Sequence, residues 1–276
     1  MTLQQITDTT TLNNGVAMPR LGLGVWQVKD GDEVIQAVRH AIEAGYRAVD
    51  TAAGYQNEEG VGTAIKECSV PRDQLFLTTK LANSDHGYES TLRAFDESRR
   101  KLGVEYLDLY LIHWPGKDKY KDSWRAFDKL YREGYIRAIG VSNFKIHHLE
   151  SLREVSDTVP AVNQVEFHPL LRQQELLDYC QDKGIQLEAW SPLMQGKLYL
   201  PLLKELAAKH GKTPAQVVLR WDLQHGVVVI PKSVHKERIV ENSGIFDFAL
   251  SDEDMTALDG LNQNHRFGSD PDDKLF

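Results

Sequence analysis

The chain has 276 residues and a formal net charge of −8, and 41% of its residues are hydrophobic and 26% charged. That composition is ordinary for a globular protein, and the negative charge argues against nucleic acid or an anionic membrane as the main partner. The two cysteines, Cys68 and Cys180, lie outside any CxxC motif, the first residues lack the apolar run of a signal peptide, and no apolar stretch reaches the ~20 residues of a membrane span. We therefore expect a cytoplasmic protein without a disulfide framework.

Apolar segments of strand length alternate with amphipathic segments along the chain. A hairpin-like start comes first, with Asn14-Gly15 as the turn between Thr10–Leu12 and Val16–Met18. Eight strands are then predicted, at Leu21–Gly24, Ala48–Val49, Leu75–Thr79, Leu107–Ile112, Ile136–Val141, Val162–Glu166, Gln186–Ala189 and Val227–Ile230. The helices predicted between them include Asp32–Ala44, Glu58–Cys68, Glu89–Leu102, Ser123–Glu133, Gln173–Lys183 and Thr213–Leu223.

The ends of these segments and their composition predict how they are arranged. Glycine readily takes the left-handed conformation that ends a helix, and it follows four amphipathic runs as Gly45, Gly103, Gly134 and Gly184. Thr213-Pro214 predicts an N-cap followed by proline at the first helical position. The strands are mainly apolar or β-branched, as buried parallel strands are. Eight alternations without a linker predict one domain over residues 1–276, a (β/α)8 TIM barrel with an N-terminal β-hairpin; an open doubly wound sheet of six or seven strands is the alternative.

Two nucleotide-binding motifs are begun in this sequence but not completed. Gly22-Leu23-Gly24 starts like GxGxxG, but the third glycine position holds Gln27. Gly211-Lys212-Thr213 resembles the end of a P-loop, but Leu206 stands where that loop begins with glycine. The sequence therefore contains neither a Rossmann fingerprint nor a P-loop.

Residues with ionisable side chains lie at the ends of predicted strands or in the loops that follow them: Asp50, Tyr55, Lys80, His113, Glu166 and His168. Taken alone, an aspartate at such a place usually caps a helix, a lysine is solvated and a histidine is a hydrogen-bonded wall residue. The carboxyl ends of all barrel strands face one mouth, however. Neighbouring strands that end in this way therefore indicate a shared active site.

Five blocks, in chain order, resemble the aldo-keto reductase superfamily. They are Asp50–Glu58, Thr79-Lys80, Leu109–Pro115, Gly140–Phe144 and Ile230–Ser233. The compact length and the tail Leu261–Asn264 are most similar to the bacterial 2,5-diketo-D-gluconate reductase branch. One departure flanks Tyr55: the family usually has a bulky residue before this tyrosine and glycine after it, and here those residues are Gly54 and Gln56. The departure puts the flexibility of this loop in question.

The resemblance implies a catalytic tetrad of Asp50, Tyr55, Lys80 and His113, with no metal. Physical chemistry agrees with these roles. A free tyrosine has a pKa of about 10, which burial alone raises further, so it is a poor proton donor at neutral pH. A Lys80 ammonium beside Tyr55 lowers that pKa, and Asp50 keeps Lys80 charged. His113 donates a hydrogen bond that orients the carbonyl of the substrate.

The resemblance also implies a binding site for NADPH. The matching positions are Ser142, Asn143, Gln164, Trp190, Ser191, Pro192, Leu193, Lys232, Ser233, Val234, Arg238 and Asn242. Ser142, Asn143 and Gln164 match the residues that hold the nicotinamide carboxamide, and Trp190 matches the aromatic residue that stacks on the ring. Residues 191–193 are expected to follow the pyrophosphate, and the remaining positions the adenosine end.

Lys232 and Arg238 decide the expected choice of cofactor. They follow the last predicted strand and supply the positive charge that a 2′-phosphate needs, so NADPH is favoured over NADH. Without the other blocks, the same two residues would indicate only the solvated start of a helix.

The substrate walls are expected from Trp26, His113, Trp114 and the C-terminal tail around Arg266 and Phe267. The two tryptophans are also consistent with core positions, and the tail with a mobile terminus. The polar tail favours an open pocket for small polar aldehydes and ketones. We expect a monomer, because no long exposed apolar stripe is evident.

Two other functions compete with a reductase. A metal-dependent barrel hydrolase could use Asp50, His113, Glu166 and His168, but the HxH pair expected at the first strand is replaced by Gly22-Leu23-Gly24. A regulatory subunit that binds NADP without turning over substrate is the second, since members of the same superfamily serve channels in this way.

Overall fold

The structure, a computed structural model, describes residues 5–116 and 119–273. In that part of the chain an antiparallel hairpin comes first, formed by β1 (Thr9–Thr11) and β2 (Ala17–Pro19). Eight parallel strands then form one sheet: β3 (Leu23–Gly24), β4 (Ala48–Asp50), β5 (Phe76–Leu81), β6 (Leu107–Ile112), β7 (Ile136–Ser142), β8 (Val162–Glu166), β9 (Gln186–Trp190) and β10 (Val228–Val229). Each strand overlaps its predicted range.

The sheet closes on itself. Strands pair with their neighbours in chain order from β3 to β10, and the bridges Leu21↔Val229 and Gly24↔Lys232 join the first strand to the last. The Gly22 amide donates to the Val229 carbonyl at 2.9 Å across this seam. The predicted barrel is therefore confirmed, and the open-sheet alternative is wrong because an open sheet leaves two edge strands unpaired.

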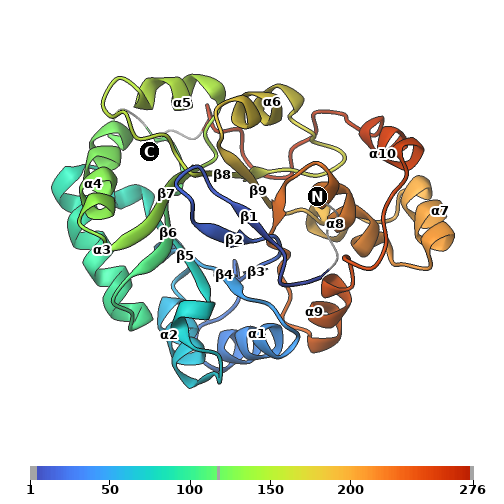
Figure 1. The fold of residues 1–276 in the computed structure, drawn as a ribbon, viewed down its shortest axis with the longest axis horizontal. Helices are drawn as coiled ribbons and strands as arrows, with labels where there is room; N and C mark the ends of the chain where they lie inside the picture. The colour runs from blue at the N-terminus through green and yellow to red at the C-terminus, as the bar shows by residue number, and fades with distance from the viewer. Residues whose placement is uncertain (1–4, 117–118, 274–276) are drawn as a thin grey trace.

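Helices surround the barrel (Figure 1): α1 (Asp32–Glu43), α2 (Glu58–Glu67), α3 (Tyr88–Leu102), α4 (Tyr120–Arg132), α5 (Ile146–Leu152), α6 (Gln174–Asp182), α7 (Pro201–His210), α8 (Pro214–Gln224), α9 (Lys236–Ser243) and α10 (Asp252–Asp259). Of these, α5, α7, α9 and α10 lie outside the predicted ranges. The four predicted helix-ending glycines all have a positive φ, and Thr213 caps α8 by accepting from the Gln216 amide. None of the described helices combines the length and the apolar composition that a membrane span requires.

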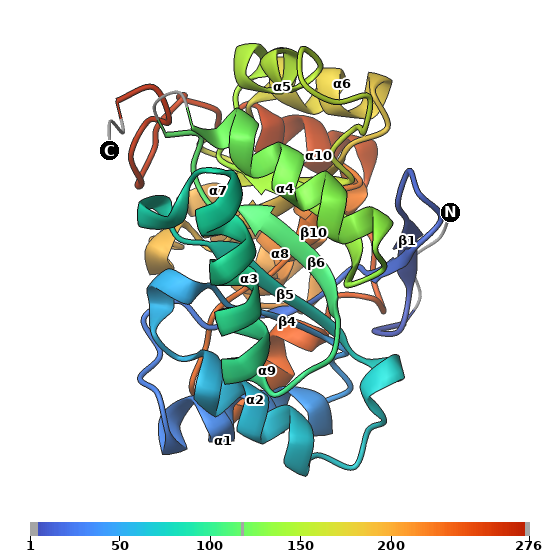
Figure 2. The ribbon, with the colours of Figure 1, turned by 90° about the vertical axis from the view of Figure 1, so that its left-hand side faces the viewer.

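The two ends of the barrel are built differently, and they face opposite sides of the molecule (Figure 2). The hairpin covers the end at which the strands begin, where Leu12 and Met18 cluster with Ala48, Phe76 and Val162, the first residues of β4, β5 and β8. The C-terminal segment lies at the other end (Figure 2). The carboxyl ends of the strands are thus left for a functional site.

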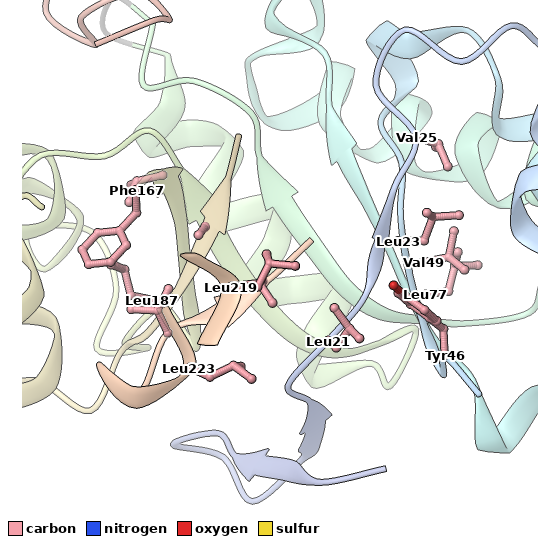
Figure 3. Packing of buried hydrophobic residues seen from close by; sticks show 14 of the residues in the cluster. Leu21, Leu23, Val25, Tyr46, Val49, Leu77, Phe167, Leu187, Leu219 and Leu223 are labelled. Atoms are coloured by element: carbon pink, nitrogen blue, oxygen red, sulfur yellow. The ribbon is translucent and has the colours of Figure 1, made fainter. Parts of the chain in front are cut away.

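The period of two along each strand directs alternate side chains outward to the helices and inward to the barrel axis. Val49, Leu77 and Leu187 belong to the main core between the strands and the helices (Figure 3). The next residue on β4, Asp50, and the next on β9, Glu188, have the opposite orientation and are buried inside the barrel. Polar side chains of neighbouring strands therefore meet at its mouth.

Candidate active site

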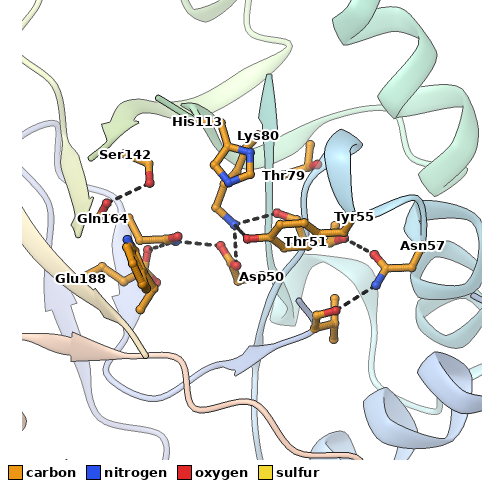
Figure 4. A network of polar contacts seen from close by, with 12 residues as sticks. Asp50, Thr51, Tyr55, Asn57, Thr79, Lys80, His113, Ser142, Gln164 and Glu188 are labelled. Atoms are coloured by element: carbon orange, nitrogen blue, oxygen red, sulfur yellow. Dashed lines mark hydrogen bonds and ion pairs between the residues drawn. The ribbon is translucent and has the colours of Figure 1, made fainter. Parts of the chain in front are cut away.

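Asp50, Lys80 and Tyr55 form a hydrogen-bonded chain in the mouth of the barrel (Figure 4). Asp50 ends β4, Lys80 lies on the neighbouring strand β5, and Tyr55 ends a short 3-10 turn (Ala53–Tyr55). Lys80 Nζ donates to Asp50 Oδ2 at 2.6 Å, to the Thr51 carbonyl at 2.9 Å and to Tyr55 OH at 3.2 Å. These bonds use all three ammonium hydrogens and hold Lys80 in one position.

Burial and charge act in opposite directions on these groups. Burial lowers the pKa of Lys80, but the Asp50 carboxylate and the Tyr55 hydroxyl more than offset this and hold the pKa above its ordinary value. Burial raises the pKa of Tyr55 above its ordinary value, and the Lys80 ammonium opposes that rise without reversing it, so the lowering expected from Lys80 is outweighed. Tyr55 is therefore protonated at neutral pH and lies beside a positive charge, which is the arrangement that a proton donor needs.

His113 follows β6 and approaches Tyr55 from the side. The two rings are edge to face, with their centroids 5.5 Å apart. Asn143 Nδ2 donates to the His113 carbonyl at 2.9 Å, which ties the residue after β6 to the residue after β7. The structure thus brings together all four members of the predicted tetrad.

Gln164 and Glu188 extend the chain across the barrel, and the sequence analysis did not single out Glu188. The two residues are register partners on β8 and β9. Gln164 Nε2 donates to Asp50 Oδ1 and to Glu188 Oε2, both at 2.8 Å. Burial, reinforced by the Asp50 charge, raises the pKa of Glu188 to about 8. The spacing in the sequence could have predicted this position. Glu188 lies two residues before Trp190, and side chains two residues apart on a strand point to the same face.

Ser142, Asn143 and Trp190 form a second network beside the first. Ser142 Oγ donates to the Gln164 carbonyl at 2.8 Å and accepts from Asn143 Nδ2 at 3.1 Å. Trp190 Nε1 donates to Asn143 Oδ1 at 2.8 Å. Asn143 and Ser191 hold φ angles of 63° and 50°, in the left-handed region. Such strained backbone tends to gather at functional sites.

One cavity of about 1150 Å³ opens above these residues. The predicted site residues that line it are Trp26, Asp50, Tyr55, His113, Trp114, Ser142, Asn143, Gln164, Trp190, Ser191, Pro192, Leu193, Lys232, Ser233, Val234, Arg238 and Asn242. Lys80 is the exception, because it lies beneath the cavity with no exposed surface. Residues from near both ends of the chain therefore line the same cavity.

The chemical groups in this cavity fit a nicotinamide cofactor with a 2′-phosphate. Gln164 and Asn143 each use both of their amide hydrogens within the protein. The Gln164 carbonyl oxygen is left to accept from the NH₂ of a carboxamide, and Asn143 Oδ1, which already accepts from Trp190 Nε1, has a second lone pair for the same group. Lys232 and Arg238 are exposed, and neither has an ion-pair partner among residues 5–116 and 119–273. Two cations without counter-charges suit a phosphate.

The C-terminal segment forms a wall of the cavity and is fastened to Glu166. The Phe267 and Gly268 amides donate to Glu166 Oε1 at 2.7 Å and to Glu166 Oε2 at 3.1 Å. His168 Nε2 lies 3.1 Å from Glu166 Oε1, and both side chains are fully buried. Glu166 therefore holds the tail of the chain over the end of β8.

The expected substrate walls are found in part. Trp26 is 48% exposed and lines the cavity, whereas Trp114 lines it but is almost buried. Phe267 lines the cavity as expected, but Arg266 does not, because its guanidinium donates to Gln173 Oε1 at 2.9 Å instead.

The residues weighed as metal ligands have other partners. Asp50 is bound to Lys80, and Glu166 to the tail. Within the described part of the chain, the group of side chains near enough to hold an ion is His147, His148 and Asp272, which does not line the cavity.

Gly54 and Gln56, which flank Tyr55 and depart from the usual family pattern, affect the backbone of this turn. Gln56, the residue after the 3-10 turn, has φ 57° and ψ 33°, a left-handed conformation that costs a residue with a Cβ roughly 1–2 kcal/mol. A Cβ on Gly54 would meet nothing within 4 Å. A side chain could therefore begin at Gly54 without a clash at its Cβ, and Tyr55 keeps its bond to Lys80.

The chain is similar to several known proteins over nearly its whole length. A family model described as aldo/keto reductase family matches residues 20–263. A glyoxal reductase from Bacillus subtilis (strain 168) is 61% identical over 270 residues, which are 98% of either chain. Methylglyoxal reductase DkgA from Escherichia coli (strain K12) is 48% identical over 95% of this chain and 96% of its own. The crystal structure of a Gox0644 variant in complex with NADPH has a TM-score of 0.93 at 43% identity and covers 98% of this chain and 99% of that one.

Proposed function

The chain belongs to the aldo/keto reductase family, and on that basis we propose that it reduces small aldehydes and ketones to alcohols with NADPH, with Tyr55 as the proton donor. The protein is an oxidoreductase. The observation that carries the proposed role of Tyr55 is the position of its hydroxyl, 3.2 Å from the buried Lys80 ammonium and on the cavity wall.

Each member of the tetrad has a task at a defined atom. Tyr55 OH holds the proton that the substrate oxygen receives as negative charge develops on it. Lys80 Nζ stabilises the tyrosinate that this transfer leaves behind, and Asp50 keeps Lys80 charged where burial alone would neutralise it. The His113 ring orients the substrate carbonyl by donating a hydrogen bond.

The cofactor site has two anchoring ends. When bound, NADPH supplies the hydride that reduces the carbonyl carbon. The carbonyl oxygens of Asn143 and Gln164 hold its carboxamide, and Trp190 packs on its ring. Lys232 and Arg238 bind the 2′-phosphate with charge-assisted hydrogen bonds. The other proposed cofactor contacts are Ser142, Ser191, Pro192, Leu193, Ser233, Val234 and Asn242.

We further propose a cytoplasmic monomer that acts on small polar carbonyl compounds. The substrate contacts three walls of the cavity: the exposed Trp26, the buried Trp114 and the C-terminal segment that is bound to Glu166. Two relatives are named for glyoxal and methylglyoxal, which are small dicarbonyl compounds. Gel filtration of the purified protein tests the monomer.

A panel of carbonyl compounds tests the proposed reaction. Glyoxal, methylglyoxal and larger monofunctional aldehydes are compared by the loss of NADPH absorbance, before and after dialysis against EDTA. We expect turnover that EDTA does not change. Tight NADPH binding without turnover of any carbonyl would support a regulatory subunit instead, and activity that is lost to EDTA and restored by zinc would contradict the proposal.

A further inference from the structure

Glu188 is a buried ionisable residue that the proposed mechanism does not use. It lies on β9 two residues before Trp190, and only 2% of its surface is exposed. Its Oε2 accepts a hydrogen bond from Gln164 Nε2 (Figure 4). Gln164 lines the cavity and Glu188 does not. Gln164 therefore lies between Glu188 and the cavity.

The hydrogen bonds of Gln164 leave one part of its amide for the cavity. Nε2 has two hydrogens, and these go to Asp50 Oδ1 and Glu188 Oε2 at 2.8 Å each. A flipped amide would turn its oxygen toward the Asp50 carboxylate, which has no hydrogen to donate, and would lose that bond. The group left for a ligand is therefore the carbonyl oxygen, an acceptor.

We propose that Glu188 is a positioning residue for the cofactor, which accepts the second amide hydrogen of Gln164 and so keeps the Gln164 carbonyl oxygen directed at the carboxamide NH₂ of the bound nicotinamide. This inference rests on the proposed role of Gln164 in cofactor binding. With Asp50 as its single partner, the Gln164 amide would be free to rotate about one bond. The second bond comes from a different strand, and it fixes the plane of the amide.

The charge of the site explains how a second carboxyl group is accommodated beside Asp50. Burial raises the pKa of Glu188 to about 8, with the Asp50 carboxylate acting in the same direction, so Glu188 is mostly neutral at neutral pH. The Lys80–Asp50 pair then stays balanced. A glutamine at this position supplies the same acceptor oxygen, whereas a leucine supplies none.

Calorimetric titration of two variants with two ligands tests the proposal. The ligands are NADPH and 2′-phosphoadenosine diphosphoribose, which is the cofactor without its nicotinamide. Glu188→Leu should weaken NADPH binding by about 2- to 10-fold, the usual worth of one hydrogen bond, and leave the affinity for the fragment unchanged. Glu188→Gln should restore the affinity for NADPH.

Each other outcome has a distinct meaning. Equal losses for NADPH and the fragment in Glu188→Leu would show a merely structural role and overturn the proposal, and so would an unchanged NADPH affinity. If the leucine variant does not fold, Glu188→Ala carries the same comparison. Gln164→Leu tests the premise separately: an unchanged NADPH affinity there would remove Gln164 from the cofactor site. A loss in Gln164→Leu with none in Glu188→Leu would contradict the role of Glu188 alone.

Discussion

Gly268 lies against the indole of Trp190, so close that a Cβ on Gly268 would come within 2.4 Å of Trp190 Cη2. Non-bonded carbon atoms prefer a separation of about 3.5–4.0 Å. The C-terminal segment is held close to Trp190, because the Phe267 and Gly268 amides donate hydrogen bonds to the Glu166 carboxylate. Burial acts to raise the pKa of Glu166, but His168 and these two amides hold it below its ordinary value, so the carboxylate stays ionised.

Gly268→Ala should weaken NADPH binding, because the added methyl group must displace either the Trp190 ring or the tail. Overpacking of this kind costs about 1–3 kcal/mol, which corresponds to roughly 5- to 100-fold in affinity. Quenching of tryptophan fluorescence during NADPH titration measures it. Gly260→Ala is the matched control, because a Cβ there meets only carbonyl oxygens of the preceding helical turn. Wild-type affinity in both variants would separate the tail from the cofactor site.

Tyr55→Phe should leave NADPH binding intact and lower turnover by roughly 10²–10⁴-fold, the usual contribution of a positioned general acid. Lys80→Met should be comparably damaging, because it leaves Tyr55 and Asp50 without the charge between them. Steady-state kinetics and cofactor titration together distinguish loss of chemistry from loss of binding. Tyr199→Phe, at an exposed tyrosine, is the control. Near-normal turnover in Tyr55→Phe would rule out its role as the acid.

Arg238→Ala should reduce the preference for NADPH over NADH. A charge-assisted hydrogen bond is worth roughly 1.5–3 kcal/mol, so the affinity for NADPH should fall by about 10–100-fold while that for NADH changes little. Lys236→Ala is the control, because Lys236 lies on the same helix but pairs with Glu43 and does not line the cavity. Equal losses for the two cofactors would mean that Arg238 does not recognise the phosphate.

Asp222 on α8 makes the stability of the protein depend on pH. It is fully buried, and its carboxyl oxygens have no hydrogen-bond partner among the described residues. Burial raises its pKa well above the ordinary value. The folded state therefore binds a proton that the unfolded chain has released above about pH 4, so the free energy of unfolding falls as the pH rises from there.

Asp222→Asn removes this titration. At about pH 8 its melting temperature should exceed that of the wild type by ~2 °C or more, since 1 kcal/mol is worth about 2–4 °C in a chain of this size. The difference should disappear below about pH 4, where the wild-type carboxyl is neutral in both states. Thermal unfolding followed by circular dichroism over this pH range is the measurement. A difference that does not change with pH would show that Asp222 is not protonated in the fold.

The sequence by itself determined the secondary structure of this protein, that is, where most of its strands and helices lie and where several helices end. The eight strands and the left-handed glycines at the helix ends could be predicted because hydrophobic period and helix termination are properties of short segments. The same reasoning placed Asp50, Lys80 and His113 at one mouth, because parallel barrel strands all end at the same face. Whether that barrel closed was settled by pairs such as Leu21↔Val229, which no local pattern contains.

Only the tertiary structure decided which side chains touch and which protonation states they hold. Lys80 lies beneath the cavity, Gln164 is held between Asp50 and Glu188, and the tail rests on Trp190. These contacts join segments far apart in the chain, and their geometry follows from packing rather than from periodicity. The pKa of Glu188 is near 8 for the same reason: the burial that raises it exists only once the barrel has closed around that residue.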